Sequence, residues 1–236
     1  QIMYNAHYQS YSPPNVPKLE TETYHNKVVL KWDDISEYSI DAITRYADFE
    51  GYKIYKSIDG GETWGDNSFK IFDDQNIHVG WQPIAQFDLS AVEDSNFCIY
   101  NPYNCEDSLT RNISISGPDN ITPWFNLGNN SGLEYQFIDT LKEECSRCGV
   151  IDGLEYTYSV TAYDMGIERP YSVDYVYQDN GYYTSDTTQS STNPLGWAEP
   201  YGYPSIENSK GTSIHDPNFS TVLPGYQVDN NVNTIK

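Results

Sequence analysis

The alternation of residues 155–163 (EYTYSVTAY) constrains the fold more than any other feature of the chain. Its apolar and aromatic members fall on one parity: Tyr156, Tyr158, Val160 and Ala162. That two-residue period is typical of a β-strand with one buried face. Residues 49–58 (FEGYKIYKSI) alternate in the same way, and no window of ten residues holds a helical period without a Pro or Gly interruption. We therefore predict an all-β chain, with the stretch 35–47 as the one candidate for a helical turn.

The remaining strands are predicted from shorter β-rich segments that are bounded by turn residues. They lie at 27–32 (KVVLKW), 63–64, 81–89 and 133–140. Two long stretches between strands, about 90–132 and 164–205, are predicted to be loop insertions. Loops of such length are usually functional or cross-linked. Residues 1–16 and 211–236 are polar and interrupted by Pro, which predicts an extended N-terminal arm and a C-terminal tail or linker.

The charge of the chain excludes some partners. With 34 Asp and Glu against 13 Lys and Arg, the formal net charge is −21. Such an acidic chain repels a phosphate backbone, so nucleic-acid binding is excluded.

No apolar run approaches the roughly 18 residues that span a bilayer, so no transmembrane segment is predicted. Leu, Ile, Val and Phe are scarce, and the 22 Tyr and 5 Trp supply the apolar area that a core needs.

Four cysteines, an even number, are expected to form two disulfides in an oxidising compartment: Cys98, Cys105, Cys145 and Cys148. Pairing of Cys98 with Cys105 and of Cys145 with Cys148 is favoured, because each bond closes a short loop. A four-thiolate zinc site, a redox pair and the other connectivities are the alternatives. The chain begins with Gln1 rather than Met, as after removal of a signal peptide. We therefore expect a secreted protein, extracellular or on a cell surface.

Three segments together resemble the fibronectin type III domain. Pro17 followed by Val29-Leu30-Lys31-Trp32 is similar to the early strands of that family, whose Trp packs in the core. Residues 49–57 are similar to its central strand. Residues 150–162 (VIDGLEYTYSVTA) are similar to the strand that carries its corner tyrosine, here Tyr156, whose hydroxyl bonds back to the backbone.

This resemblance implies an immunoglobulin-like β-sandwich over residues 17–210, with the two insertions at about 90–132 and 164–205. It also implies a last strand near Tyr203–Ser209 and a place among the modules of large bacterial surface proteins. Such modules are mostly spacers, adhesive units or parts of fibres. The family has no shared active site.

Residues 57–64 (SIDGGETW) resemble the Asp-box of sialidase-like propellers, S-x-D-x-G-x-T-W. The pattern describes a hairpin in which Ser57 and Asp59 cap the turn and Trp64 packs beneath it. Propellers repeat the box around a ring, and here it occurs once. We interpret it as a structural turn.

Catalytic motifs are missing from the sequence. The four histidines are scattered, and neither a nucleophile elbow nor a phosphate-binding glycine loop is present. We predict no enzymatic activity. For the acidic loops the candidate cofactor is calcium, with oxygen ligands from Asp73, Asp74 and Asn76. The alternative for these acidic residues is plain solvated charge.

Aromatic residues crowd the second insertion, and the candidates for a ligand site or an interface are Tyr175, Tyr177, Tyr182, Tyr183, Trp197 and Tyr201. Aromatic platforms bind sugars and also form protein interfaces. The sequence favours a non-enzymatic structural or adhesive subunit of an extracellular assembly such as a filament. It would associate with copies of itself or with surface proteins, through edge strands, terminal arms and aromatic loops. The alternative is a carbohydrate-binding module that uses these aromatics to bind glycans.

Overall fold

The computed structural model describes residues 11–42, 45–100, 102, 110–140, 149–167, 171–178, 181–189 and 203–225. Within these residues the all-β prediction is confirmed, because antiparallel strands dominate and helix is limited to three short segments. The helical segments are η1 (Ile35–Tyr38), η2 (Asn67–Phe69) and α2 (Ala91–Asn96). Of the helices described, none is long and apolar enough to cross a membrane.

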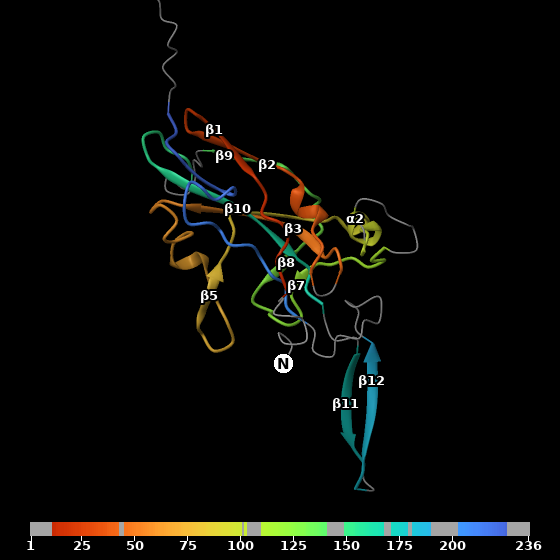
Figure 1. Ribbon diagram of the computed structural model, residues 1–236. Helices are drawn as coiled ribbons and strands as arrows, with labels where there is room; N and C mark the ends of the chain where they lie inside the picture. Colours follow the sequence, from red (N-terminus) through yellow and green to blue (C-terminus); the bar gives the residue numbers. More distant parts are fainter. Residues whose placement is uncertain are drawn as a thin grey trace, which may run out of the picture.

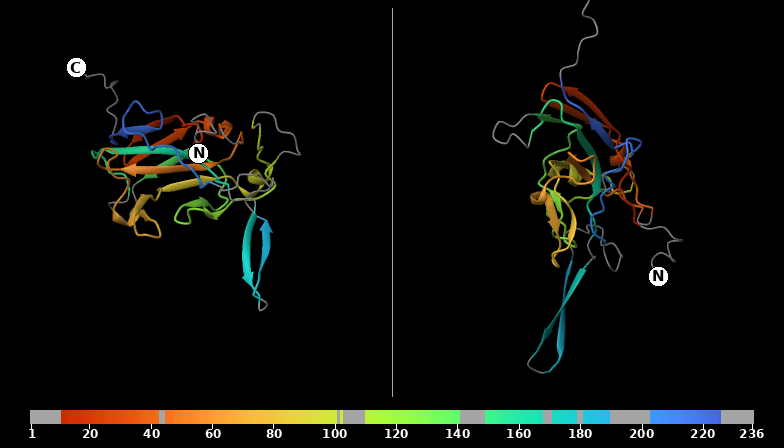
Figure 2. Two further views of the ribbon diagram at one scale, coloured as in Figure 1. Left: turned by 60° about the horizontal axis from the view of Figure 1, so that its bottom comes forward. Right: turned by 90° about the vertical axis from the view of Figure 1, so that its left-hand side faces the viewer.

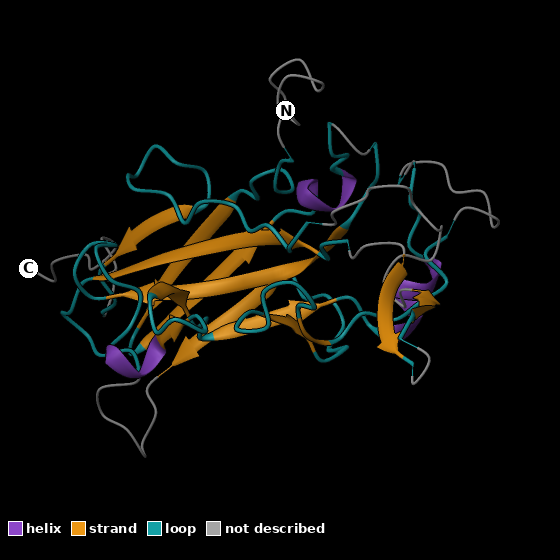
Figure 3. Ribbon diagram, turned by 90° about the horizontal axis from the view of Figure 1, so that it is seen from below, coloured by secondary structure: helices purple, strands orange, loops and turns teal. Residues whose placement is uncertain are grey.

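Two antiparallel sheets form the body of the molecule (Figures 1 and 3). The first has the order β1 (Leu19–Tyr24), β2 (Lys27–Trp32), β9 (Gln136–Thr140). The second has the order β13 (Phe219–Val222), β10 (Tyr156–Asp164), β3 (Phe49–Ser57), β6 (Ala85–Asp88). The two segments with the clearest alternation, β10 and β3, pair at the centre of the second sheet, with Val160 opposite Ile54.

Side chains of one parity from both sheets share a core. The second sheet contributes Tyr52 and Ile54 of β3 with the alternating residues of β10, and the first contributes Val28, Leu30 and Trp32 of β2. None of these side chains is more than 5% exposed. Because one cluster draws on both sheets, the sheets pack face to face as a sandwich.

The opposite face of the second sheet is buried as well, whereas an antiparallel sheet often leaves one face solvated. All nine residues of β10 are buried. Two smaller clusters cover this outer face: one joins Tyr55 to Trp64 and Phe219, and the other gathers around Tyr163 and Tyr203. The described parts of the insertions therefore fold back onto the sandwich.

Three hairpins extend from this body. They are β4 (Lys70–Phe72) with β5 (His78–Trp81), β7 (Gly117–Pro118) with β8 (Asn126–Gly128), and β11 (Tyr171–Tyr177) with β12 (Tyr183–Gln189). Figure 2 shows the β11–β12 hairpin standing away from the sandwich. Both stretches predicted as loops thus contain regular structure.

Other local expectations need correction. Thr63 and Trp64, predicted as a returning strand, lie in an irregular segment, and the strands that pair with β3 are β10 and β6. Helix α2 was not expected, although Ser90 and Glu93 form a capping box that marks its start.

The edge of β10 is covered in two parts. Its first half pairs with β13, from Tyr156 opposite Val222 to Ser159 opposite Phe219. Its second half is met by residues 206–208, through the isolated bridge of Tyr163 with Glu207 and the bond from Asn208 N to Ala162 O, and a second bridge, of Ile167 with Tyr203, follows just beyond the strand. The expected last strand near Tyr203–Ser209 is therefore only a bridged segment. The last strand of the sheet, β13, lies within the segment that was expected to be a C-terminal tail. Pro217 and Pro224 bound it, and it is too short to show a clear alternation.

The described part of the N-terminal arm lies on its own sandwich. Tyr11 stacks on Tyr203, with ring centroids 4.2 Å apart. Asn15 N donates to Ser39 Oγ at 2.6 Å, and Asn208 Nδ2 donates to Pro14 O. Residues 11–16 are therefore not a free arm, and residues 1–10 lie outside the described residues.

Candidate ligand-binding pocket

The aromatic residues singled out in the second insertion are only partly described. Tyr177 and Tyr182 lie at the tip of the β11–β12 hairpin and are 63% and 72% exposed. For Tyr175 and Tyr183 the structure describes the backbone pairing alone, with Tyr183 opposite Tyr177. Trp197 and Tyr201 lie outside the described residues. The described structure therefore places four of the six on one hairpin, with the side chains of Tyr177 and Tyr182 exposed at its tip.

The calcium expectation finds no support in the geometry of its loop. Asp73 Oδ1 already accepts the backbone N–H groups of Gln75 and Ile77, at 3.0 and 2.8 Å. Asn76 has a positive φ of 61°, as expected for a tight turn between β4 and β5. Across the described part of the chain, no group of three His, Cys, Asp or Glu side chains could hold a metal ion.

One of the four cysteines is described. Cys98 is 6% exposed and disulfide-bonded, and its backbone bridges to Thr110. Cys98 and Thr110 therefore lie side by side. Cys105, Cys145 and Cys148 lie outside the described residues, so the pairing stays a prediction.

The fold markers lie in the interior. Trp32, Tyr156 and Trp64 are 5%, 3% and 6% exposed. In the Asp-box segment, Asp59 accepts from Thr63 N and from the hydroxyls of Ser57 and Thr63, at 2.6–2.9 Å. Trp64 packs beneath this turn against Tyr55 and Phe219. These residues therefore have structural roles: they form a turn and cover the outer face of the second sheet.

A pocket of about 720 Å³ opens over the outer face of the second sheet. Its floor is formed by β3 and β6, with Lys53, Tyr55, Ala85 and Gln86. One wall is the β4–β5 hairpin with the segment after it: Lys70, Ile71, Phe72, Trp81, Gln82 and Pro83. The other wall is the end of the β7–β8 hairpin: Trp124, Phe125 and Asn126.

The two walls touch, which holds the pocket in shape. Gly80 of β5 approaches the ring of Phe125 so closely that a Cβ at this glycine would lie 3.1 Å from Phe125 Cε1. Trp124 lies beside Phe125, with ring centroids 6.4 Å apart. On the opposite wall Trp81 is in edge contact with His78, at 5.0 Å. The indoles of Trp81 and Trp124 thus belong to different walls of one pocket.

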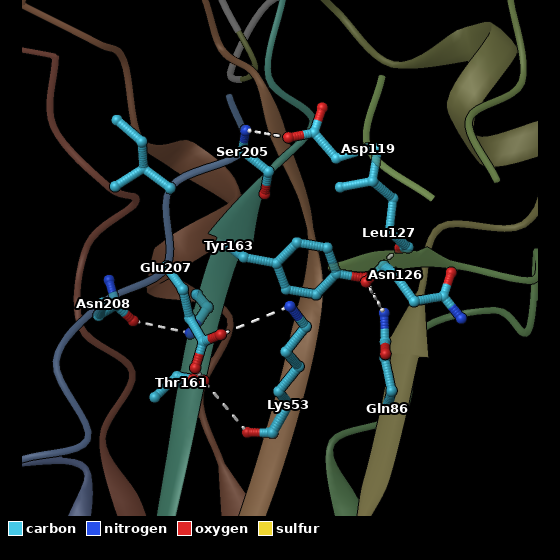
Figure 4. A network of polar contacts seen from close by, with 12 residues as sticks. Lys53, Gln86, Asp119, Asn126, Leu127, Thr161, Tyr163, Ser205, Glu207 and Asn208 are labelled. Carbon is cyan, nitrogen blue, oxygen red and sulfur yellow. Dashed lines mark hydrogen bonds and ion pairs between the residues drawn. The ribbon is translucent and has the colours of Figure 1, made fainter. Parts of the chain in front are cut away.

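The floor is fixed by a buried polar network (Figure 4). Gln86 Nε2 donates to the Tyr163 hydroxyl at 2.8 Å and to Asn126 O at 3.1 Å, and the Tyr163 hydroxyl donates to Leu127 O. Burial raises the pKa of Tyr163 well above its ordinary value, so the phenol stays protonated and available as a donor. The network therefore ties β6 and β10 to the β7–β8 wall.

In a second part of the network, the carboxylate of Glu207 neutralises the charge of Lys53. Lys53 Nζ lies 3.4 Å from Glu207 Oε2 and 4.2 Å from the centroid of the Tyr163 ring. Burial opposes ionisation of Glu207, but the charges of Lys53 and Lys210 and the hydrogen bonds from Thr161 and Tyr55 together hold the pKa of this carboxyl below its usual range. Glu207 stays charged and also accepts from Tyr55 and Thr161, at 3.0 and 2.7 Å.

Lys53, Tyr55 and the pocket residues between Trp81 and Gln86 lie in segments that the sequence predicted as strands, but none of the lining residues was predicted as a ligand contact. Trp124 stands alone in a stretch predicted as loop, and Trp81 was placed at the start of a strand. Nothing in the local sequence shows that residues 43 positions apart share a pocket. Only the cross-strand pairing and the Gly80–Phe125 contact bring them together.

Comparisons with known proteins do not identify the chain: no protein-family model matches it, and neither does any curated protein or solved structure.

Proposed function

We propose that this chain is a non-enzymatic binding module that holds a saccharide in the pocket between the β4–β5 and β7–β8 hairpins. The observation that carries the proposal is that Trp81 and Trp124 lie on opposite walls of one pocket whose lining also includes amide side chains. Indole faces pack against the apolar faces of sugar rings, while amide groups exchange hydrogen bonds with hydroxyls. Gln82, Gln86 and Asn126 supply those amides.

The fold supports a fibronectin type III kind of sandwich for this module. In immunoglobulin-type sandwiches the first, second and fifth strands share one sheet, and the third, sixth and seventh share the other. Counting β1, β2, β3, β6, β9, β10 and β13 as strands one to seven, the chain has this division, with the fourth strand beside the third. The hydroxyl of Tyr156 accepts from Ile151 N at 3.0 Å, as a corner tyrosine would. Such modules suit an extracellular or cell-surface protein.

Binding of an oligosaccharide panel by the intact chain and by single variants tests the proposal. Trp81→Ala and Trp124→Ala should each weaken binding by about tenfold, because each removes one stacking surface. Tyr24→Ala is the matched control, since Tyr24 is an exposed aromatic on β1, 45% accessible and outside the pocket. Unchanged affinity in both tryptophan variants would contradict the pocket as the binding site.

A second candidate function, assembly with other copies or with surface proteins, is favoured by the β11–β12 hairpin. Its strands pair with each other over seven residue pairs, and no third described strand pairs with either of them. Free edges of this kind can accept a strand from a partner. Tyr177 and Tyr182 at its tip are exposed and suit an interface.

Excision of the hairpin tests assembly without disturbing the sandwich. Ile167 and Tyr203, which flank residues 168–202, form a β-bridge with each other. Ile167 N donates to Tyr203 O at 2.9 Å, and Tyr203 N donates to Ile167 O at 2.8 Å. A short Gly-Ser linker can therefore replace residues 168–202. Light scattering should then show a smaller assembly than the intact chain forms. An unchanged size would exclude the hairpin as the contact.

A further inference from the structure

The pocket is lined by positively charged side chains although the chain as a whole is strongly negative. Acidic residues number 34 and basic residues 13 in the whole sequence. Yet the described residues that line the pocket include two lysines, Lys53 and Lys70, and no Asp or Glu. A ligand in this pocket therefore meets a local surface of the opposite sign from most of the protein.

Lys70 is the lysine that faces the ligand space. It is the direct cross-strand partner of Trp81 in the β4–β5 ladder, so both side chains stand on the same face of the hairpin. Its Nζ lies 5.6 Å from the centroid of the Trp81 ring. Among the described residues, no carboxylate forms an ion pair with Lys70, whereas Lys53 is held by Glu207. Lys70 thus places a positive charge beside an aromatic surface, with no described counter-charge.

We infer that the pocket selects a carboxylated saccharide, such as a uronic acid oligomer, with the sugar ring on Trp81 and the carboxylate at Lys70 Nζ. This inference rests on the proposed saccharide site and adds the ligand class. A neutral sugar would use the indoles and amides but would give the ammonium group no anionic partner. A carboxylate would form a charge-assisted hydrogen bond to it, which is stronger than a neutral one.

Calorimetric titration with pairs of oligosaccharides tests the inference. Each pair shares chain length and linkage and differs only in a carboxylate or a hydroxymethyl group, as in galacturonic acid against galactose and glucuronic acid against glucose trimers. The carboxylated member of at least one pair should bind about five- to tenfold more tightly, the value of one charge-assisted bond. The preference should shrink as salt is raised, because Lys70 is only half-buried.

Two variants separate this inference from the saccharide site itself. Lys70→Gln should abolish the preference while leaving neutral sugars within about twofold of the original affinity, and Lys70→Arg should retain it. Lys27→Gln is the control, because Lys27 also lacks a described ion pair but lies on β2, over the Tyr24 ring. Equal binding of both members of every pair would overturn the inference and leave the saccharide site standing. No binding of any oligosaccharide would overturn both.

Discussion

Arg111 is a charged side chain with only 2% exposure, and it links the first insertion to the second sheet. Its Nη1 donates to Glu50 at 2.8 Å and to Asp94 at 3.0 Å, and its Nη2 donates to Phe49 O. Burial raises the pKa of Glu50 well above its ordinary value, although Arg111 opposes that rise. Burial raises the pKa of Asp94 as well. The guanidinium is therefore what permits two carboxyl groups to share this interior site.

Replacing Arg111 should be costly. Arg111→Met leaves the two carboxyls without their buried partner, so the free energy of unfolding should fall by about 3–5 kcal/mol. Urea titration at neutral pH measures it. Lys31→Met is the control, because its pair with Glu22 is about half-exposed and should change stability by less than about 0.5 kcal/mol. If both variants unfolded at the same urea concentration, the structural role of Arg111 would be refuted.

At the scale of elements, the turn after β3 shows how a short motif, residues 57–64, fixes a turn through its own hydrogen bonds. Burial alone would raise the pKa of Asp59, but the hydrogen bonds from Ser57 and Thr63 together outweigh it and lower the pKa to about 2. Gly61 has a φ of 96°, and a Cβ there would lie 2.9 Å from the ring of Phe219. The hydrogen bonds depend only on residues within the box, which is why the sequence alone identified this turn, whereas the contact of Gly61 with Phe219 depends on a distant strand.

Removing the acceptor of that turn should weaken the cover over the outer face. Asp59→Ala loses three hydrogen bonds at a largely exposed site, so we expect a loss of about 1–2 kcal/mol, similar to loss of a helix cap. Glu62→Ala is the matched control, because Glu62 is exposed in the same turn and none of its side-chain atoms is seen in the turn's hydrogen bonds. A loss of the same size in both variants would contradict the assigned role of Asp59.

The elements differ in how far the sequence could predict them. Strands β2, β3 and β10 coincide with the segments whose alternation was clear, because a two-residue period reports one buried face directly. Strand β13 has four residues, and β10 offers it a partner that no local pattern reveals. The pocket was missed for the same reason: Lys70 and Trp124 line one pocket only because two hairpins touch, and their separate segments carry no shared motif.

At the scale of the whole molecule, several carboxyl groups are buried in a chain of net charge −21. Burial, together with the charge of Asp41, raises the pKa of Asp48 to about 7 from its ordinary 3.8. Burial and the charge of Asp48 raise the pKa of Asp164 well above its ordinary value. These groups lie at the end of the sandwich where Tyr203 OH donates to Asp48 at 3.3 Å.

Stability should therefore fall as pH rises from about 4 to about 7. Between the unfolded pKa of 3.8 and the folded pKa near 7, folded Asp48 holds a proton that the unfolded chain has lost. For each such group the free energy of unfolding falls by up to about 1.4 kcal/mol per pH unit across that window. Thermal melts should give a higher midpoint near pH 5 than near pH 8, and Asp48→Asn should flatten the difference. A midpoint that rose with pH over this range would contradict the account.

The central claim is that Trp81 and Trp124 line the binding site, and the indole N–H signals of the five tryptophans test it most directly. In a titration of ¹⁵N-labelled chain with a uronic acid trimer, each indole gives one peak, assigned by Trp→Phe variants. We predict that the Trp81 and Trp124 peaks move together with one saturation curve, while the buried Trp32 and Trp64 peaks stay in place. Movement of the Trp197 peak alone, or of no indole peak, would contradict the pocket as the site of binding.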